Sequence, residues 1–178
     1  MIGVLVSGNG TNLQALLDAE LPVVAVASNR RSAPALARAG ELPTRAFELD
    51  DYADRSERDG AMADWLQEQG VHLVVLAGYM HLLTAAFLDR FPDAIVNVHP
   101  SLLPDFPGAH AVEDQLAAGV TESGATVHLV DLGVDSGPIL AQERVPVRDD
   151  DTPETLHERI KQIEHELLPR VVGELCAR

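Results

Sequence analysis

IGVLVSGNGTNLQALL, residues 2–17, contains the pattern that decides the fold. Its first five residues form an apolar run typical of a buried strand, and from Asn12 to Ala19 leucines recur at helical spacing. Between them, Ser7-Gly8-Asn9-Gly10-Thr11-Asn12 supplies glycines that allow a tight turn and a close backbone approach to a ligand. A strand, a Gly-rich turn and a helix in this order indicate a doubly wound α/β fold.

The same alternation continues along the chain. Further strands are expected at 23–27, 44–49, 73–77, 94–98, 125–130 and 139–147. Helices are expected at 33–39, capped by Ser32, at 52–69, 84–91 and 111–118, and from Pro153 onward, capped by Thr152. The pattern predicts one α/β domain over residues 1–178, with a Rossmann-like, mostly parallel sheet of about seven strands, helices on both faces and one antiparallel strand near the end.

Composition narrows the functional classes. The formal net charge of −15 argues against nucleic acid and anionic membranes as partners. No apolar run reaches the roughly 18 residues that span a bilayer, and the N-terminus lacks a basic leader, so a cytoplasmic location is expected. Cys176 is the single cysteine and the histidines lack metal-ligand spacing, so neither an intrachain disulfide nor a metal is expected.

The turn at residues 7–12 is expected to bind a phosphate group, because it leads into the N-terminus of a helix, where free N–H groups attract anions. A dinucleotide is disfavoured: Leu13 replaces the third glycine of that fingerprint, and Ser28-Asn29-Arg30 stands where an acidic residue would bind the ribose. A structural turn without any ligand is the alternative.

The strongest candidate for chemistry is the end of the fifth strand, Asn97-Val98-His99-Pro100. Asn97 and His99 leave the same face of the strand, because side chains alternate. An amide donor beside an imidazole can stabilise an oxyanion and supply a proton. Asp135, in a later turn, is expected to pair with His99, and His128 to support both. Structural hydrogen bonding of these side chains is the alternative.

Taken together, these segments resemble the glycinamide ribonucleotide branch of the folate-dependent formyltransferases. The matching motifs are SGNGTNL (7–13), NVHPSLLP (97–104), and His128 followed by DSGPIL (135–140), and the likeness covers nearly the whole chain. The resemblance implies direct transfer of the formyl group of 10-formyltetrahydrofolate to the amine of glycinamide ribonucleotide. It implies small-molecule substrates, and a monomer or homodimer.

The resemblance also implies roles for individual residues. The catalytic residues are Asn97, His99 and Asp135, and the ribonucleotide is bound by Gly10, Thr11, Asn12, Lys161 and Glu164. The folate is bordered by Arg55, Met80, His81, Leu82, Leu83, Asn97, Asp131, Leu132, Gly133, Val134 and Asp135. One departure concerns position 81, where the family often has Arg. From the residues alone, Lys161 and Glu164 would be surface charges.

Two other functions fit parts of the pattern. A formyltransferase acting on another amine, such as an amino sugar nucleotide, shares the Asn-His-Asp core, although such enzymes usually carry Arg-Gly after the SLLP loop and this chain has Pro104-Asp105-Phe106-Pro107-Gly108. A phosphate-binding Rossmann module without catalysis would bind the ligand and show no turnover.

Overall fold

The computed structural model describes residues 1–177. Its strands are β1 (Ile2–Val6), β2 (Val23–Ser28), β3 (Thr44–Ala46), β4 (Leu73–Leu76), β5 (Ile95–His99), β6 (Glu122–Leu129) and β7 (Ile139–Pro146). Its helices are α1 (Thr11–Asp18), α2 (Ala35–Arg38), the short 3-10 helix η1 (Leu49–Asp51), α3 (Arg55–Glu68), α4 (Ala85–Leu88), α5 (Ala111–Ala118) and α6 (Pro153–Cys176).

The strands follow the order β3-β2-β1-β4-β5-β6-β7 in one seven-stranded sheet. The pairs β1–β2, β1–β4 and β2–β3 are parallel, whereas β6–β7 is antiparallel. The predicted α/β fold with a mostly parallel sheet is therefore confirmed. The chain divides into two compact units, residues 1–96 and the residues from Asn97 onward, which we describe in turn.

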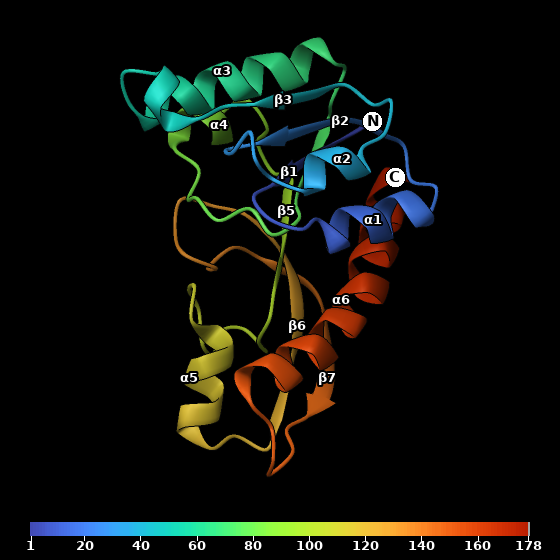
Figure 1. Cartoon of the computed structure of the whole chain (residues 1–178), viewed down its shortest axis with the longest axis vertical. Helices are drawn as coiled ribbons and strands as arrows, with labels where there is room; N and C mark the ends of the chain where they lie inside the picture. The colour runs from blue at the N-terminus through green and yellow to red at the C-terminus, as the bar shows by residue number, and fades with distance from the viewer. Residues whose placement is uncertain (178) are drawn as a thin grey trace. The chain divides into compact units, whose positions relative to one another are not determined.

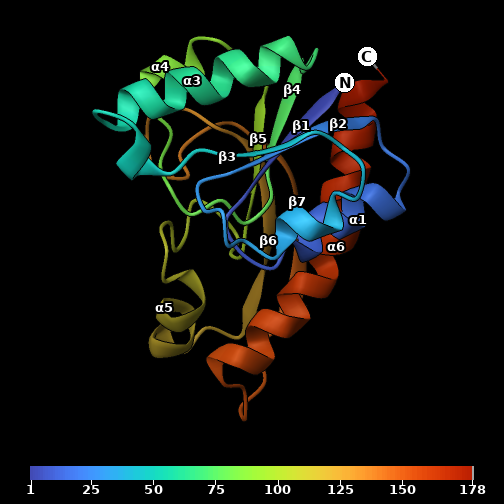
Figure 2. The same ribbon diagram turned by 45° about the horizontal axis from the view of Figure 1, so that its top comes forward.

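In the first unit, the sheet lies between two pairs of helices. Figures 1 and 2 show α3 and α4 on one side of its strands and α1 and α2 on the other. All five residues of β1 are buried, as expected for a parallel strand covered on both faces. In sheets of this kind, ligands bind at the carboxyl ends of the parallel strands. We therefore look for the binding groups of this unit directly after β1, β2 and β4.

Several predicted boundaries in this unit are wrong by a few residues. The helix expected from Tyr52 begins at Arg55, because the side chain of Asp54 accepts a hydrogen bond from the Glu57 N–H and caps it. Ser32 does not cap α2, whose N-cap is Pro34 without a side-chain bond. The predicted strand 44–49 ends at Ala46, before η1, and α4 is also shorter than predicted.

The second unit contains the β6–β7 hairpin, with α6 packed against both strands. The side chains of Thr152 and Thr155 form a reciprocal capping box at the start of α6. The predicted apolar stripe of this helix is buried at Leu156, Ile160, Leu167 and Val171, but Ile163 is half-exposed.

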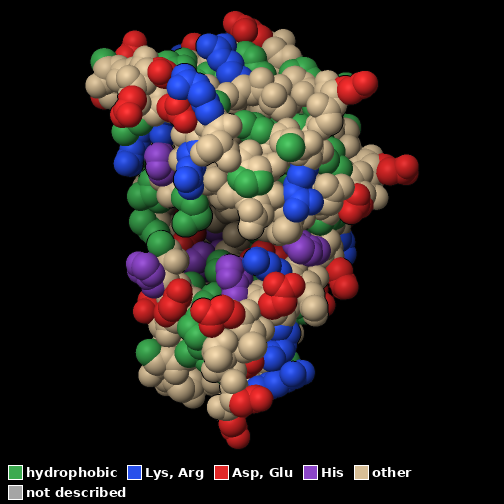
Figure 3. Space-filling view, in the orientation of Figure 1, with side chains coloured by type: hydrophobic (Ala, Val, Ile, Leu, Met, Phe, Trp, Pro, Cys, Tyr) green, Lys and Arg blue, Asp and Glu red, His purple; other side chains and the backbone are tan. Residues whose placement is uncertain are grey.

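Acidic side chains are spread over the face drawn in Figure 3, with Lys and Arg side chains interspersed. This distribution agrees with the net charge of −15. Among residues 1–177, no helix has both the length and the apolar character needed to cross a membrane.

Candidate active site

The Gly-rich turn of the first unit is shaped by close packing at Gly10. This residue caps α1 with a left-handed φ of 74°, and an added Cβ would lie 2.5 Å from the Cβ of Ala35. No side chain caps α1 and its first turn has no acidic residue. The positive end of the helix dipole, which begins at Thr11, therefore suits an anion.

Ser7, which opens this turn, holds neighbouring strand ends together. Its hydroxyl donates to Oδ1 of Asn29 at 2.6 Å and accepts from the backbone N–H of Met80 at 2.9 Å. The turn after β1 and the segment after β4 are thus tied through one buried hydroxyl. The sequence reasoning gave Ser7 no such role.

The segment Met80–Leu83 follows β4 and presents apolar side chains at its surface. Met80 is 67% exposed and Leu82 is 55% exposed, while Leu83 is buried. Exposed apolar side chains next to a strand end suit a flat aromatic ligand. Arg55 is exposed at the start of α3 in the same unit.

His81 is held by the buried side chain of Arg58. Its Nδ1 lies 2.7 Å from an Arg58 nitrogen, and its Nε2 lies 3.2 Å from Nδ2 of Asn29. Partial burial, together with the positive charges of Arg58 and Arg55, lowers the pKa of His81, and Asp59 opposes this shift. The sequence gave no signal for Arg58, which stands in the charged run Arg55-Ser56-Glu57-Arg58-Asp59.

In the second unit, the end of β5 carries Asn97 and His99, as predicted. His99 is 5% exposed, and its Nε2 lies 2.8 Å from the carbonyl oxygen of Phe106. A carbonyl oxygen only accepts, so Nε2 carries a proton. Asn97 is half-exposed, and its Nδ2 lies 3.3 Å from Nε2 of His128.

Asp135 reaches both histidines from the β6–β7 connection. Its Oδ2 lies 3.3 Å from Nδ1 of His99, and its Oδ1 lies 3.5 Å from Nε2 of His128. Burial opposes ionisation of this carboxyl, but hydrogen bonds from His128 and the Gly108 N–H, with the charges of both histidines, lower its pKa. The expected proximity of Asp135, His99 and His128 is therefore present.

The turn that places Asp135 depends on two backbone features. Asp135 itself has a left-handed φ of 51°, which Asp tolerates better than most residues. At Gly137, an added Cβ would lie 1.8 Å from the carbonyl oxygen of Leu129, so only glycine allows the chain to return this closely to β6.

His128 connects the amide and the carboxylate of this cluster. Its Nδ1 lies 2.8 Å from the carbonyl oxygen of Leu129 and therefore carries a proton. In the neutral ring, Nε2 can accept from Asn97; in the protonated ring, it can donate to Asp135. The cluster thus contains two imidazoles that can each gain a proton beside one carboxylate.

Backbone from Asp131 to Asp135 forms an exposed loop in the second unit. Oδ1 of Asp131 accepts from the Gly133 N–H and from the Ser136 hydroxyl, which fixes the loop. Leu132 and Val134 are exposed, at 73% and 47%. These apolar side chains have the same character as those of Met80 and Leu82 in the first unit.

Lys161 and Glu164 lie one turn apart on α6. Lys161 is half-exposed, but Glu164 is only 5% exposed, so its interpretation as a surface charge from the residues alone is wrong. A carboxylate rarely occupies such a position unless it is paired.

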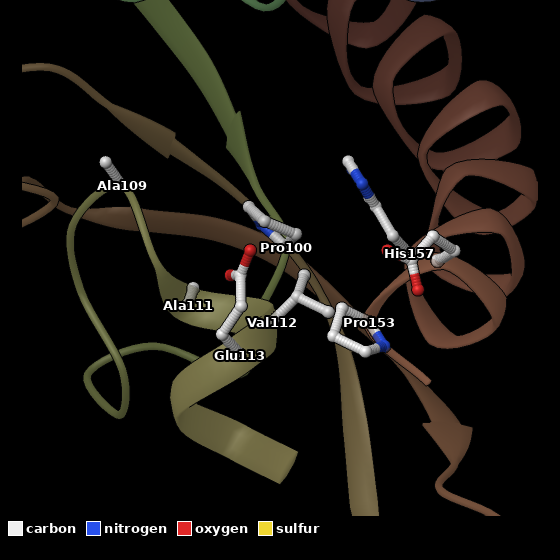
Figure 4. Close-up of a pocket in the computed structure, with 8 residues that line it drawn as sticks. Pro100, Ala109, Ala111, Val112, Glu113, Pro153 and His157 are labelled. Carbon is white, nitrogen blue, oxygen red and sulfur yellow. The ribbon is translucent and has the colours of Figure 1, made fainter. Parts of the chain in front are cut away.

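A pocket of about 200 Å³ lies between the starts of α5 and α6 in the second unit (Figure 4). It is lined by Pro100, Ala109, Ala111, Val112, Glu113, Pro153, Glu154 and His157. Pro100 directly follows His99, so the pocket borders the strand end that bears the imidazole. Partial burial, with the charge of Lys161, lowers the pKa of His157.

The groups of this cluster suit acyl transfer. Residues 1–177 contain no set of three His, Cys, Asp or Glu side chains arranged to hold a metal ion. The His-Asp-Asn cluster offers an amide donor, two imidazoles and a carboxylate, linked by contacts of Asn97 with His128 and of Asp135 with both histidines.

Comparison with known proteins agrees with this geometry. Residues 1–172 match the family model described as formyl transferase. The chain is 47% identical to phosphoribosylglycinamide formyltransferase of Mycobacterium tuberculosis, over 97% of this chain and 83% of that protein. It is 43% identical to the trifunctional purine biosynthetic protein adenosine-3 of Gallus gallus, over 94% of this chain and 18% of that protein.

Solved structures give the same result. Glycinamide ribonucleotide transformylase 1 from Symbiobacterium toebii superposes with a TM-score of 0.93 at 45% identity, covering 96% of this chain and 84% of that chain. Phosphoribosylglycinamide formyltransferase from Bacillus halodurans superposes with a TM-score of 0.95 at 35% identity, covering 99% and 95%.

Proposed function

The chain belongs to the formyl transferase family, and from this premise we propose that it transfers the formyl group of 10-formyltetrahydrofolate to the amine of glycinamide ribonucleotide, a step of purine biosynthesis. The observation that carries the proposal is the cluster of Asn97, His99, His128 and Asp135. Its groups suit the attack of an amine on a formyl carbon.

Attack by the amine forms a C–N bond and moves an electron pair onto the formyl oxygen. Asn97 has two N–H bonds on Nδ2, and one can face His128 while the other donates to this oxygen. His99 supplies the second donor through Nε2, which exchanges the carbonyl of Phe106 for the substrate oxygen. Fixed donors of this kind stabilise an oxyanion by about 3–4 kcal/mol each.

The attacking nitrogen must then lose a proton, and the leaving nitrogen of the folate must gain one. Asp135, whose lowered pKa keeps it ionised at neutral pH, can accept the proton of the attacking nitrogen directly or through water. Protonated His99 or water can donate the proton that the folate nitrogen gains. Breakage of the bond between the formyl carbon and the folate nitrogen releases tetrahydrofolate. We expect no covalent enzyme intermediate, because Ser101, the nearest hydroxyl in the motif, donates to the backbone carbonyl of Asp105.

The remaining predicted site residues are assigned to binding of the two substrates. Gly10, Thr11 and Asn12 are assigned to the phosphate of the ribonucleotide at the start of α1. Lys161 is also assigned to the phosphate, and Glu164 to the amine-bearing part of the same substrate. The exposed apolar side chains of Met80 and Leu82 suit the pteridine ring of the folate, and exposed Arg55 suits its acidic tail. In the second unit, the exposed side chains of Leu132 and Val134 have the same apolar character.

The test is a turnover assay of the purified protein with both substrates, in which release of tetrahydrofolate is followed. Turnover with glycinamide ribonucleotide and a much lower kcat/KM with an amino sugar nucleotide would support the proposal. The reverse preference would support the sugar-amine alternative. Binding of the ribonucleotide with no turnover would support a non-catalytic phosphate-binding module.

A further inference from the structure

Arg58 is an unusual residue to find buried. Its side chain has no exposed surface, and neither has that of its neighbour Asp59. Nε and one terminal nitrogen of Arg58 contact Oδ1 of Asp59 at 2.9 and 2.6 Å. Burying an ion pair costs desolvation energy, and well-packed apolar residues are often as stable in its place. The pair therefore calls for an explanation beyond stability.

The second terminal nitrogen of Arg58 points to His81, as described above. Asp59 meanwhile uses Oδ2 to accept from the backbone N–H of Thr84 at 2.8 Å. At the other end of the segment, the N–H of Met80 is held by Ser7. Both ends and the middle of the Met80–Thr84 segment are thus fixed by buried side chains of this unit.

The contact with Arg58 also sets the charge of His81. A guanidinium can only donate, so Nδ1 of His81 must accept from Arg58 and carries no proton. A second ring proton would face the donor nitrogen of Arg58. The exposed loop therefore presents a neutral imidazole, and the positive charge lies behind it on a side chain that no ligand can touch.

We propose that Arg58 is a positioning residue for the folate co-substrate: its buried guanidinium holds Asp59 and His81 so that the Met80–Leu83 loop offers a rigid, uncharged wall to the folate ring. This inference rests on the proposed function. It predicts that Arg58 affects folate binding without contacting folate, and leaves the amine substrate unaffected.

Arg58→Lys tests the proposal, because lysine keeps the charge beside Asp59 but has a single ammonium that cannot bridge to His81. We expect KM for 10-formyltetrahydrofolate to rise about tenfold, the scale of one lost charge-assisted hydrogen bond. KM for glycinamide ribonucleotide and kcat should change less than about twofold. The matched control is Arg90→Lys, an exposed arginine that contacts Asp64 of α3 and the Ala86 carbonyl of α4. It should behave as the wild type.

A pair of variants at His81 keeps the test decisive if Arg58→Lys does not fold. His81→Asn retains an acceptor for Arg58 at the place of Nδ1 and should keep KM for folate within about threefold, whereas His81→Phe removes it and should raise KM about tenfold. Equal folate KM in all folded variants, or equal rises in both KM values, would overturn the proposal.

A binding measurement separates this inference from the proposed function. If the wild-type protein shows no formyl transfer, calorimetry with tetrahydrofolate replaces the kinetics. Binding that weakens about tenfold in Arg58→Lys but not in Arg90→Lys would support the positioning role even though the proposed reaction had failed. No tetrahydrofolate binding by the wild type, or equal binding by both variants, would overturn it.

Discussion

Nδ1 of His99 lies 3.3 Å from Oδ2 of Asp135, which joins the end of β5 to the β6–β7 connection at the point where chemistry is proposed. With Nε2 facing the Phe106 carbonyl, both ring nitrogens of His99 face oxygen acceptors. Only the doubly protonated ring can donate to both. This arrangement suits a group that stabilises a developing negative charge.

Replacing His99 should therefore remove much of the rate. We expect His99→Ala to lower kcat by about a hundredfold or more, as for loss of an oxyanion donor. His72→Ala, at an exposed histidine of the first unit, is the control and should retain full activity. Wild-type kcat in His99→Ala would remove the imidazole from the mechanism.

The ionised state of Asp135 should contribute to stability in a defined pH range. Its folded-state pKa lies below the ordinary value of 3.8, so its contribution is fully present above that value and is lost as pH falls towards the folded-state pKa. Thermal unfolding between about pH 5 and pH 2 should show a smaller loss of stability in Asp135→Asn than in the wild type. Parallel pH profiles would show that the carboxylate is not stabilised in the folded state.

Gly10 should be intolerant of any side chain. Gly10→Ala combines a left-handed φ of 74° with a Cβ 2.5 Å from Ala35, so we expect a loss of about 2–4 kcal/mol in unfolding free energy. Gly40→Ala is the matched control, because φ is 60° there and no atom lies within 4 Å of the added Cβ. It should lose only about 1–2 kcal/mol, measured by denaturant unfolding. Equal losses would show that the α2 contact does not constrain the turn.

Lys161, the single lysine, is proposed to bind the substrate phosphate. Lys161→Met should raise KM for glycinamide ribonucleotide about tenfold or more and leave KM for folate unchanged, since a charge-assisted hydrogen bond contributes about 1.5–3 kcal/mol. Arg170→Met, an exposed cation further along α6, should have no effect. A change in KM for folate alone would contradict the assignment of Lys161.

Much of the fold follows from local pattern. The apolar runs at β1, β2 and β4 and the Thr152–Pro153 signal before α6 predicted these elements to within a residue or two at the predicted ends. The start of α3 was predicted too early, because the helical periodicity of the sequence continues back to Tyr52. The helix begins only after Asp54, whose side chain caps it. Such a boundary depends on backbone geometry that residue order alone does not specify.

The candidate site, like the fold, could be predicted from the sequence only in part. The period of two in β5 placed Asn97 and His99 on one face, but no periodicity brings Asp135 to them; that expectation rested partly on family resemblance. Arg58 and Glu164 were beyond prediction, because a charged residue in a helix is usually exposed, and burial depends on distant partners such as His81.

The most direct test of the central claim, that His99 and Asp135 act together on the formyl carbon, is kcat for His99→Ala, Asp135→Asn and the double variant. If the two residues act as one unit, the double variant should be no slower than the slower single variant by more than a few-fold. Losses that multiply in the double variant would mean that the two side chains work independently, and an undiminished kcat in either single variant would contradict the mechanism outright.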